Sequence, residues 1–437
     1  MAGTIVIRAF LPSLCRLPAR PSLWAALTVI AVCVPDGPRA ADVVQPRVAD
    51  LMSLALLASV AVSLARGGAR PGRWALLAAP AALAATVAAL AAPDFLLTLP
   101  GLARFLQVFV LVPVAVTVAV RQRSDLLLVG GAVAAVSIVQ AGLGCWQALT
   151  GSGASYAGLP IRAVGTFGAG EVMALAGVVS FGLIIALAVA LTGGPARRAA
   201  ALVAAAALCP PLVMSLSRGT WLAVACAVAV MLVLRGARLA ARAAIAAVAA
   251  AVLLTLLTLL VGPAGGVIAE RAASITTSVD QPDRSVADRY QLWQAAAGMW
   301  RDHPVTGVGP KGFAAWRDTY APLALSSGSD VEDPAGGYRR EPLLSPHNMY
   351  LLVLSEQGLL GLAAFALLVG GALVRTLTRP GRSGPAGLAA AGFVTWLAVD
   401  FAYADIGGAT SLVMSVMLGL ATGWTGAAAL PSRRPAC

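Results

Sequence analysis

Long apolar runs constrain the fold of this chain more than any other feature. Backbone N–H and C=O groups cannot lack partners in hydrocarbon, so an apolar run of about 20 residues that crosses a bilayer forms a helix. With 59% hydrophobic and 11% charged residues in 437, the apolar surface exceeds what a soluble core can cover. We expect an all-α polytopic membrane protein of about 12 transmembrane helices, at residues 23–34, 48–65, 74–92, 105–120, 126–149, 172–191, 199–214, 220–234, 239–261, 349–374, 386–399 and 409–424.

The first run leaves two interpretations open. It is short, and Arg8, Arg16 and Arg20 precede it, which is also the pattern of a signal peptide. We favour a retained helix over a cleaved signal. The remaining topology is the same in both cases.

Arginine clusters alternate along the connections and predict the orientation. They precede the first run and follow the second, fourth, sixth, eighth, tenth and last runs. Because short cytoplasmic connections are enriched in arginine and lysine, both termini should be cytoplasmic. These clusters also account for the net charge of +12, and their pattern is not that of a nucleic-acid-binding face.

This orientation makes residues 262–348 one large extracytoplasmic loop between helices 9 and 10. The predicted parts are residues 1–261 with helices 1–9, the loop, and residues 349–437 with helices 10–12 and a cytoplasmic tail. Within the loop, residues 288–300 have the spacing of an amphipathic helix, with Tyr290, Trp293, Ala297 and Trp300 on one face. The glycine-rich HPVTGVGPKGF sequence that follows predicts a turn, and the composition of residues 325–342 predicts a flexible excursion without a fold.

The loop also holds both histidines of the protein. His347 lies in SPHN at the aqueous start of the tenth run, where its ring can meet both lipid-embedded and aqueous reactants. A neutral imidazole is the side chain suited to proton transfer near neutral pH, so we predict that His347 is a catalytic base. A helix cap is the alternative. His303 is interpreted as a structural residue of the turn.

Arg218, in SLSRGTW, is the strongest candidate for binding an anion. It lies on the extracytoplasmic side, which the positive-inside bias depletes of arginine. An arginine at a helix centre costs about 2.5 to 3.5 kcal/mol unless an anion pairs with it. The hydroxyl of Ser217 would add a hydrogen bond to the same anion. The alternative is an arginine that extends to the lipid headgroups.

Six further residues complete the predicted substrate-binding set. Arg284, Arg289 and Arg301 lie on or before the loop helix, and the planar guanidinium suits a diphosphate, although pairing with nearby aspartates is an equally good interpretation. Carboxylates are unusual near or within spans, so Glu171 and Glu356 are candidates for binding an arginine or positioning an acceptor. Asn348, beside His347, is the sixth.

No metal site or cofactor is expected. The six cysteines have no metal-ligand spacing, and the two histidines have no cysteine near them. The chain also lacks a phosphate-binding GxxxxGKS sequence and an HExxH sequence.

Four motifs in order give the chain a recognisable pattern. They are SLSRG at the outer end of a span, R-x-x-x-W at 289–293, W-x-x-H-P-x-x-G-x-G at 300–309, and H-N-x-Y-L with E-x-G-L-x-G at 347–361. Over residues 165–372 this order resembles the O-antigen ligase and O-antigen polymerase-like superfamily. Two positions depart from that pattern: Glu171 stands where relatives often have asparagine, and SPH stands where many have HAH.

The resemblance implies a metal-independent membrane glycosyltransferase that uses no nucleotide sugar. Such enzymes move a glycan from undecaprenyl pyrophosphate to an acceptor hydroxyl, on a lipid or another glycan, at the outer face of the cytoplasmic membrane. The resemblance therefore implies that the protein lies in the cytoplasmic (inner) membrane. His347 would match the family's base, and Arg218 and Arg289 its diphosphate-binding arginines. Direct displacement would invert the anomeric centre.

Two alternatives remain open at this point. One is a polysaccharide repeat-unit polymerase of the same fold. The other is a transporter or flippase for an anion or a lipid-linked sugar, a class that usually places its polar groups near the bilayer midplane. If Arg218 and His347 lie together at the outer end of the bundle, transfer is favoured; if they are separated along a central channel, transport is favoured.

Overall fold

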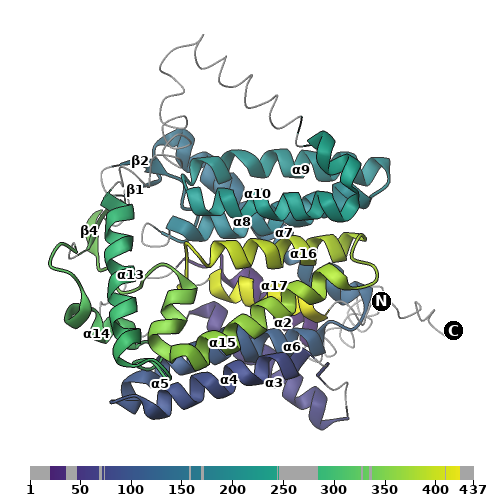
Figure 1. The fold of residues 1–437 in the computed structure, drawn as a ribbon. Helices are drawn as coiled ribbons and strands as arrows, with labels where there is room; N and C mark the ends of the chain where they lie inside the picture. Colours follow the sequence, from purple (N-terminus) through teal and green to yellow (C-terminus); the bar gives the residue numbers. More distant parts are fainter. Residues whose placement is uncertain are drawn as a thin grey trace, which may run out of the picture.

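A computed structural model describes residues 20–35, 47–67, 71–72, 74–156, 159–168, 172–243, 245, 284–325, 328–333, 337–408 and 410–423. Its long helices run beside one another, and a further helix and a small sheet lie at one end of the bundle (Figure 1). The helices of the bundle are α2 (Pro21–Ala31), α3 (Val48–Ala65), α4 (Trp74–Ala91), α5 (Phe95–Leu106), the π-helix η2 (Gln107–Leu111), α6 (Val112–Ala119), α7 (Arg123–Thr150), α8 (Val172–Thr192), α9 (Pro195–Met214), α10 (Arg218–Arg235), α15 (Met349–Thr378), α16 (Pro385–Asp400) and α17 (Thr410–Gly423).

A described helix is present at every predicted run, although at the ninth only its first residues are described. Within the described residues, seven helices are long and apolar enough to cross a membrane, and four shorter apolar helices accompany them. The ninth run, 239–261, falls almost entirely outside those residues, so the count of twelve stays a prediction. The fourth span starts earlier than predicted, because α5, η2 and α6 continue into one another over Phe95–Ala119. The prediction of a multi-pass helical membrane protein is confirmed.

Aromatic rings fill the centre of the bundle. Phe365 of α15 lies 5.2 Å from Phe109 of η2 and 5.6 Å from Phe401, which follows α16, measured between ring centroids. Phe181 of α8 contacts Trp396 of α16 in an edge-on arrangement at 4.9 Å. Lipid chains are as apolar as these side chains, so close packing rather than transfer from water holds such helices together. These ring contacts fix α15 and α16 next to the connection between α16 and α17.

The predicted loop helix is present as α13 (Arg284–Asp302), and it crosses the end of the bundle (Figure 1). Its buried face differs from the predicted one. Leu292, Ala295 and Met299 are fully buried, whereas Tyr290 is 38% exposed. α13 packs on α15 and on the short helix α14 (Gly312–Tyr320). Small and aliphatic side chains allow that close approach, and Trp293 donates its indole N–H to Pro346 O (2.9 Å).

A small sheet corrects the prediction for residues 325–342. Strands β3 (Ser329–Asp333) and β4 (Gly337–Glu341) form an antiparallel hairpin there. β3 also pairs with β1 (Ala154–Tyr156), and β1 pairs with β2 (Leu159–Arg162), giving the order β2-β1-β3-β4. The prediction of an unfolded excursion is wrong because β1, which precedes α8, supplies backbone partners that local composition does not reveal.

Helix α15 is interrupted where it was predicted to be continuous. Gly358 has φ 64° and ψ −163°, so the chain makes a break after its first nine residues. The predicted glycine-rich turn packs against this break: Val308 N–H donates to Ser355 O and Leu359 N–H donates to Pro304 O, both at 2.9 Å. A Cβ on Gly358 would lie 2.2 Å from Val305 O. The turn therefore holds the first segment of α15, directly after His347, in place.

Candidate active site

The connection between α16 and α17, residues 401–408, organises one end of the bundle. Its backbone carbonyls accept hydrogen bonds from the start of α15 and from α13. Met349 N–H at the start of α15 donates to Phe401 O (2.8 Å), and Asn348 Nδ2 donates to Ala402 O (3.2 Å). Arg289 Nη1 of α13 donates to Tyr403 O (2.9 Å). A charged donor makes the last of these bonds stronger than an ordinary one. The loop helix and α15 are thus fixed on the same connection.

His347 lies beside this connection in a constrained turn. Its φ is 48°, a left-handed conformation that side chains other than glycine rarely adopt. Its N–H donates to Ser345 Oγ (3.1 Å), and the Ser345 hydroxyl donates to the carboxylate of Asp405. Trp293 Nε1 donates to Pro346 O (2.9 Å). The two residues before His347 are therefore held by Asp405 and by α13, respectively.

The surroundings of His347 favour its neutral form. Burial lowers the pKa of the half-buried imidazole; the Asp405 carboxylate opposes that shift, and the Arg289 guanidinium adds to it. The net direction is downward from the usual 6.5. A neutral imidazole accepts a proton, whereas an imidazolium cannot. This is the state that a general base needs at neutral pH.

Arg218 is the first residue of α10, and its helix starts against the same connection. Ser217 caps the helix: its hydroxyl oxygen accepts Thr220 N–H (3.4 Å) and lies 2.8 Å from Thr220 Oγ1. Gly219 packs so closely on Tyr403 that a Cβ there would lie 2.6 Å from Tyr403 Cβ. A helix N-terminus attracts anions through its free N–H groups and its dipole. The start of α10, with Arg218, thus lies beside the residue whose carbonyl binds Arg289.

Two acidic residues belong to this region that sequence reasoning did not assign to it. Asp400, 8% exposed at the end of α16, accepts a hydrogen bond from Thr220 Oγ1 (3.4 Å). Asp405 holds Ser345, as described above. The sequence signal was available, because carboxylates are rare in this chain and both follow an apolar run within six residues. The partners in α10 and before α15 are 180 and 60 residues away and were not evident.

The remaining predicted residues are placed differently. Arg301 is exposed near the C-terminal end of α13, and twelve residues of helix separate it from Arg289 by about 18 Å. Glu356 accepts Phe313 N–H (3.1 Å) and so holds the start of α14. Asn348 caps α15 by accepting Leu351 N–H (3.0 Å). Glu171 and the side chain of Arg284 lie outside the described residues.

Comparison with known proteins agrees with the motifs. The O-antigen ligase family model matches residues 202–366, which include Arg218, Arg289 and His347. The resemblance to the O-antigen ligase-like superfamily is thereby confirmed for this part of the chain. No curated protein matches the chain.

Proposed function

Taking the match of residues 202–366 to the O-antigen ligase family as the premise, we propose that this protein moves a glycan from undecaprenyl pyrophosphate to an acceptor hydroxyl. The supporting observation is the convergence of His347, Arg289 and the start of α10 on the 401–408 connection. A cationic region beside a neutral imidazole is what a diphosphate leaving group and a hydroxyl nucleophile require.

The helix directions support an outer-face location. α10 begins at Arg218 and ends at Arg235, so the proposed site and the basic connection after α10 lie at opposite ends of the same helix. α16 likewise begins after the basic residues 375–382 and ends at the 401–408 connection. If the basic ends are cytoplasmic, the site faces the extracytoplasmic side.

Diphosphate binding is assigned to Arg218 and Arg289. The forked guanidinium donates two parallel hydrogen bonds to a phosphate group, and the N-terminus of α10 adds a partial positive charge. Negative charge accumulates on the bridging oxygen as the glycosidic bond breaks. Positive groups already in place stabilise that charge without reorganising during the reaction.

His347 takes the proton in the same step. The acceptor oxygen forms a bond to the anomeric carbon while the bond from that carbon to the phosphate oxygen breaks. The acceptor's proton goes to the imidazole, and undecaprenyl pyrophosphate leaves with the electron pair. Because the acceptor attacks the face opposite the leaving group, the anomeric centre is inverted. The Asp405 carboxylate, which raises the pKa of His347, stabilises the imidazolium that results.

This arrangement favours transfer over transport. The three residues lie around one connection at one end of the bundle, and a transporter site is expected near the midplane on interrupted helices. The interruption in α15 at Gly358 is occupied by the protein's own glycine-rich turn.

The test replaces His347 and Arg218 separately with alanine in the native host, with His303→Ala as the matched histidine control. Surface glycan length and attachment are read by gel, with protein level checked in each strain. We expect both site variants to lose attached glycan and His303→Ala to keep it. Free long polymer on its lipid carrier would assign the ligase reaction, and single-repeat product would assign the polymerase reaction. Normal glycan from well-expressed His347→Ala would overturn the proposal.

A further inference from the structure

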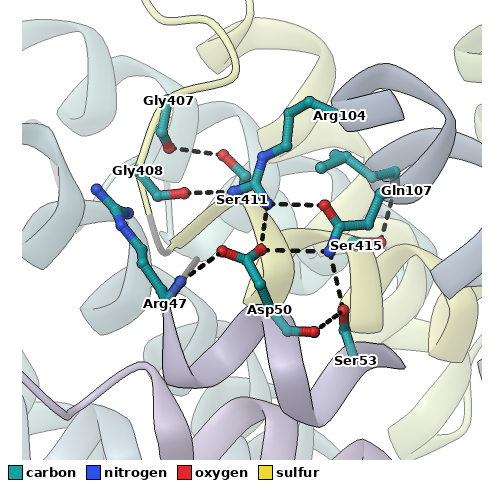
Figure 2. A network of polar contacts seen from close by, with 10 residues as sticks. Arg47, Asp50, Ser53, Arg104, Gln107, Gly407, Gly408, Ser411 and Ser415 are labelled. Carbon is teal, nitrogen blue, oxygen red and sulfur yellow. Dashed lines mark hydrogen bonds and ion pairs between the residues drawn. The ribbon is translucent and has the colours of Figure 1, made fainter. Parts of the chain in front are cut away.

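A polar network joins helices α3 and α5 outside the region that matches the family (Figure 2). Arg104 Nη1 donates to Asp50 Oδ1 (2.7 Å) and to Gln107 Oε1 (3.0 Å). Gln107 Nε2 donates to the same Asp50 oxygen (3.2 Å) and to Ser53 Oγ (2.9 Å). The side chains of Arg104 and Asp50 are only 26% and 22% exposed. Removing water from an ion pair costs free energy, and the additional hydrogen bonds of Arg104 and Asp50 offset that cost here.

The network extends from Arg104 to the start of α17. Arg104 Nη2 donates to Gly408 O (2.7 Å), so one guanidinium bridges a carboxylate on α3 and a carbonyl just before α17 (Figure 2). Ser415 Oγ of α17 donates to Val108 O (2.6 Å) within the π-helix. A π-helix departs from the α-helical hydrogen-bonding pattern and often marks a functional position. The hydrogen bonds of Arg104 and of η2 therefore hold the start and the middle of α17 against the N-terminal helices.

Gly408, whose carbonyl Arg104 holds, is close along the chain to Asp405, which contacts the turn that carries His347. Gly408 follows Asp405 by three residues, which limits their separation to about 11 Å. Asp405 accepts the hydroxyl of Ser345, and Ser345 accepts His347 N–H. A shift of the 401–408 connection is therefore transmitted to the turn that carries His347.

We propose that Arg104, held by Asp50 and Gln107, is a positioning residue that fixes the 401–408 connection and so sets Asp405 relative to His347. The N-terminal helices would then contribute to catalysis from outside the matched domain. The catalytic consequence rests on the proposed function, whereas the mechanical link between Arg104 and His347 does not.

Arg104→Lys is the informative substitution. Lysine keeps the positive charge beside Asp50, but it lacks the planar fork by which two separate guanidinium nitrogens reach the carboxylate and the Gly408 carbonyl. Arg121→Gln is the matched control, because Arg121 also bonds α3, donating to Ser63 Oγ (3.4 Å), at the opposite end of that helix. The double variant Asp50→Asn/Arg104→Gln removes the whole pair without leaving a carboxylate unpaired, in case Arg104→Lys does not fold.

The first measurement needs no substrate. In a His303→Gln background His347 is the single histidine, and its pKa can be read by NMR titration of the imidazole. The charged groups that face it are Asp405 and Arg289. We expect Arg104→Lys to lower the pKa of His347, because the carboxylate that raises it is held less firmly, and Arg121→Gln to leave it unchanged. Equal values in the two variants would overturn the inference.

The second measurement uses glycan transfer. Misplacing a catalytic group by a fraction of an ångström costs on the order of 10-fold in rate, so we expect kcat to fall by about that factor in Arg104→Lys with KM within about twofold. If Arg104 acts through Asp405, adding Arg104→Lys to Asp405→Asn causes no further loss. Additive losses would overturn the inference. A pKa shift in a protein whose wild type transfers no glycan would instead refute the proposed function and leave the mechanical link standing.

Discussion

Gly219→Ala tests the packing of α10 on the 401–408 connection. The new Cβ would lie 2.6 Å from Tyr403 Cβ and 2.8 Å from Tyr403 Cγ. Non-bonded carbons are at their optimum near 3.5 to 4.0 Å, so α10 and the connection must separate by about 1 Å. A misplacement of that size costs about 100-fold in rate when catalytic groups are shared between the two elements. We therefore expect transfer to fall by about two orders of magnitude.

The effect on stability should be much smaller. Overpacking costs about 1 to 3 kcal/mol, and alanine recovers up to about 1 kcal/mol because it favours helix more than glycine does. Gly177→Ala is the control: its Cβ, on α8, would lie 3.7 Å from Trp396 Cη2 of α16, an ordinary van der Waals contact. The assay is single-turnover glycan transfer with the purified variants, together with thermal unfolding. If Gly219→Ala transfers glycan within twofold of the wild type, the close contact between α10 and the connection does not matter for catalysis.

Two further predictions concern the base and the interrupted helix. His347 acts as a base in its neutral form, and its pKa lies below 6.5, so the transfer rate should decrease only below that pH. Arg289→Gln removes a cation that lowers the pKa of His347, so in this variant the decrease in a pH–rate profile should begin at a higher pH. A profile that does not move would contradict this electrostatic role. Gly358→Ala combines a left-handed backbone with a Cβ 2.2 Å from Val305 O, so we expect a loss of about 3 kcal/mol or more by thermal unfolding. Gly370→Ala, in open space on the same helix, should be neutral or stabilising, and equal effects would contradict the reasoning.

Sequence reasoning located the helices well because the bilayer leaves the backbone few alternatives. The predicted second run coincides with α3, and the loop helix was found from its spacing. The proposed site residues were chosen on signals of the same kind: an arginine on the side predicted to be extracytoplasmic for Arg218, and a lone imidazole at a helix start for His347. These signals are local, so a single sequence carries them.

The missed features all depend on contacts between distant segments. β3 pairs with a strand before α8, and Asp405 bonds Ser345 from 60 residues away. Arg104 and Asp50 are 54 residues apart on two helices whose order in space the sequence does not specify. The break at Gly358 has the same origin, since glycine in an apolar run is compatible with a continuous helix until the packed turn is known.

Direct transfer by the purified protein tests the central claim most closely. Wild type, His347→Ala and His303→Ala would be reconstituted in lipid vesicles with a polyprenyl-pyrophosphate-linked glycan and an acceptor, and the initial rate of transfer measured at neutral pH. Loss of a general base typically costs 10²- to 10⁴-fold, so we expect a loss of about that size in His347→Ala and none in His303→Ala. Transfer by His347→Ala at the wild-type rate would contradict the account.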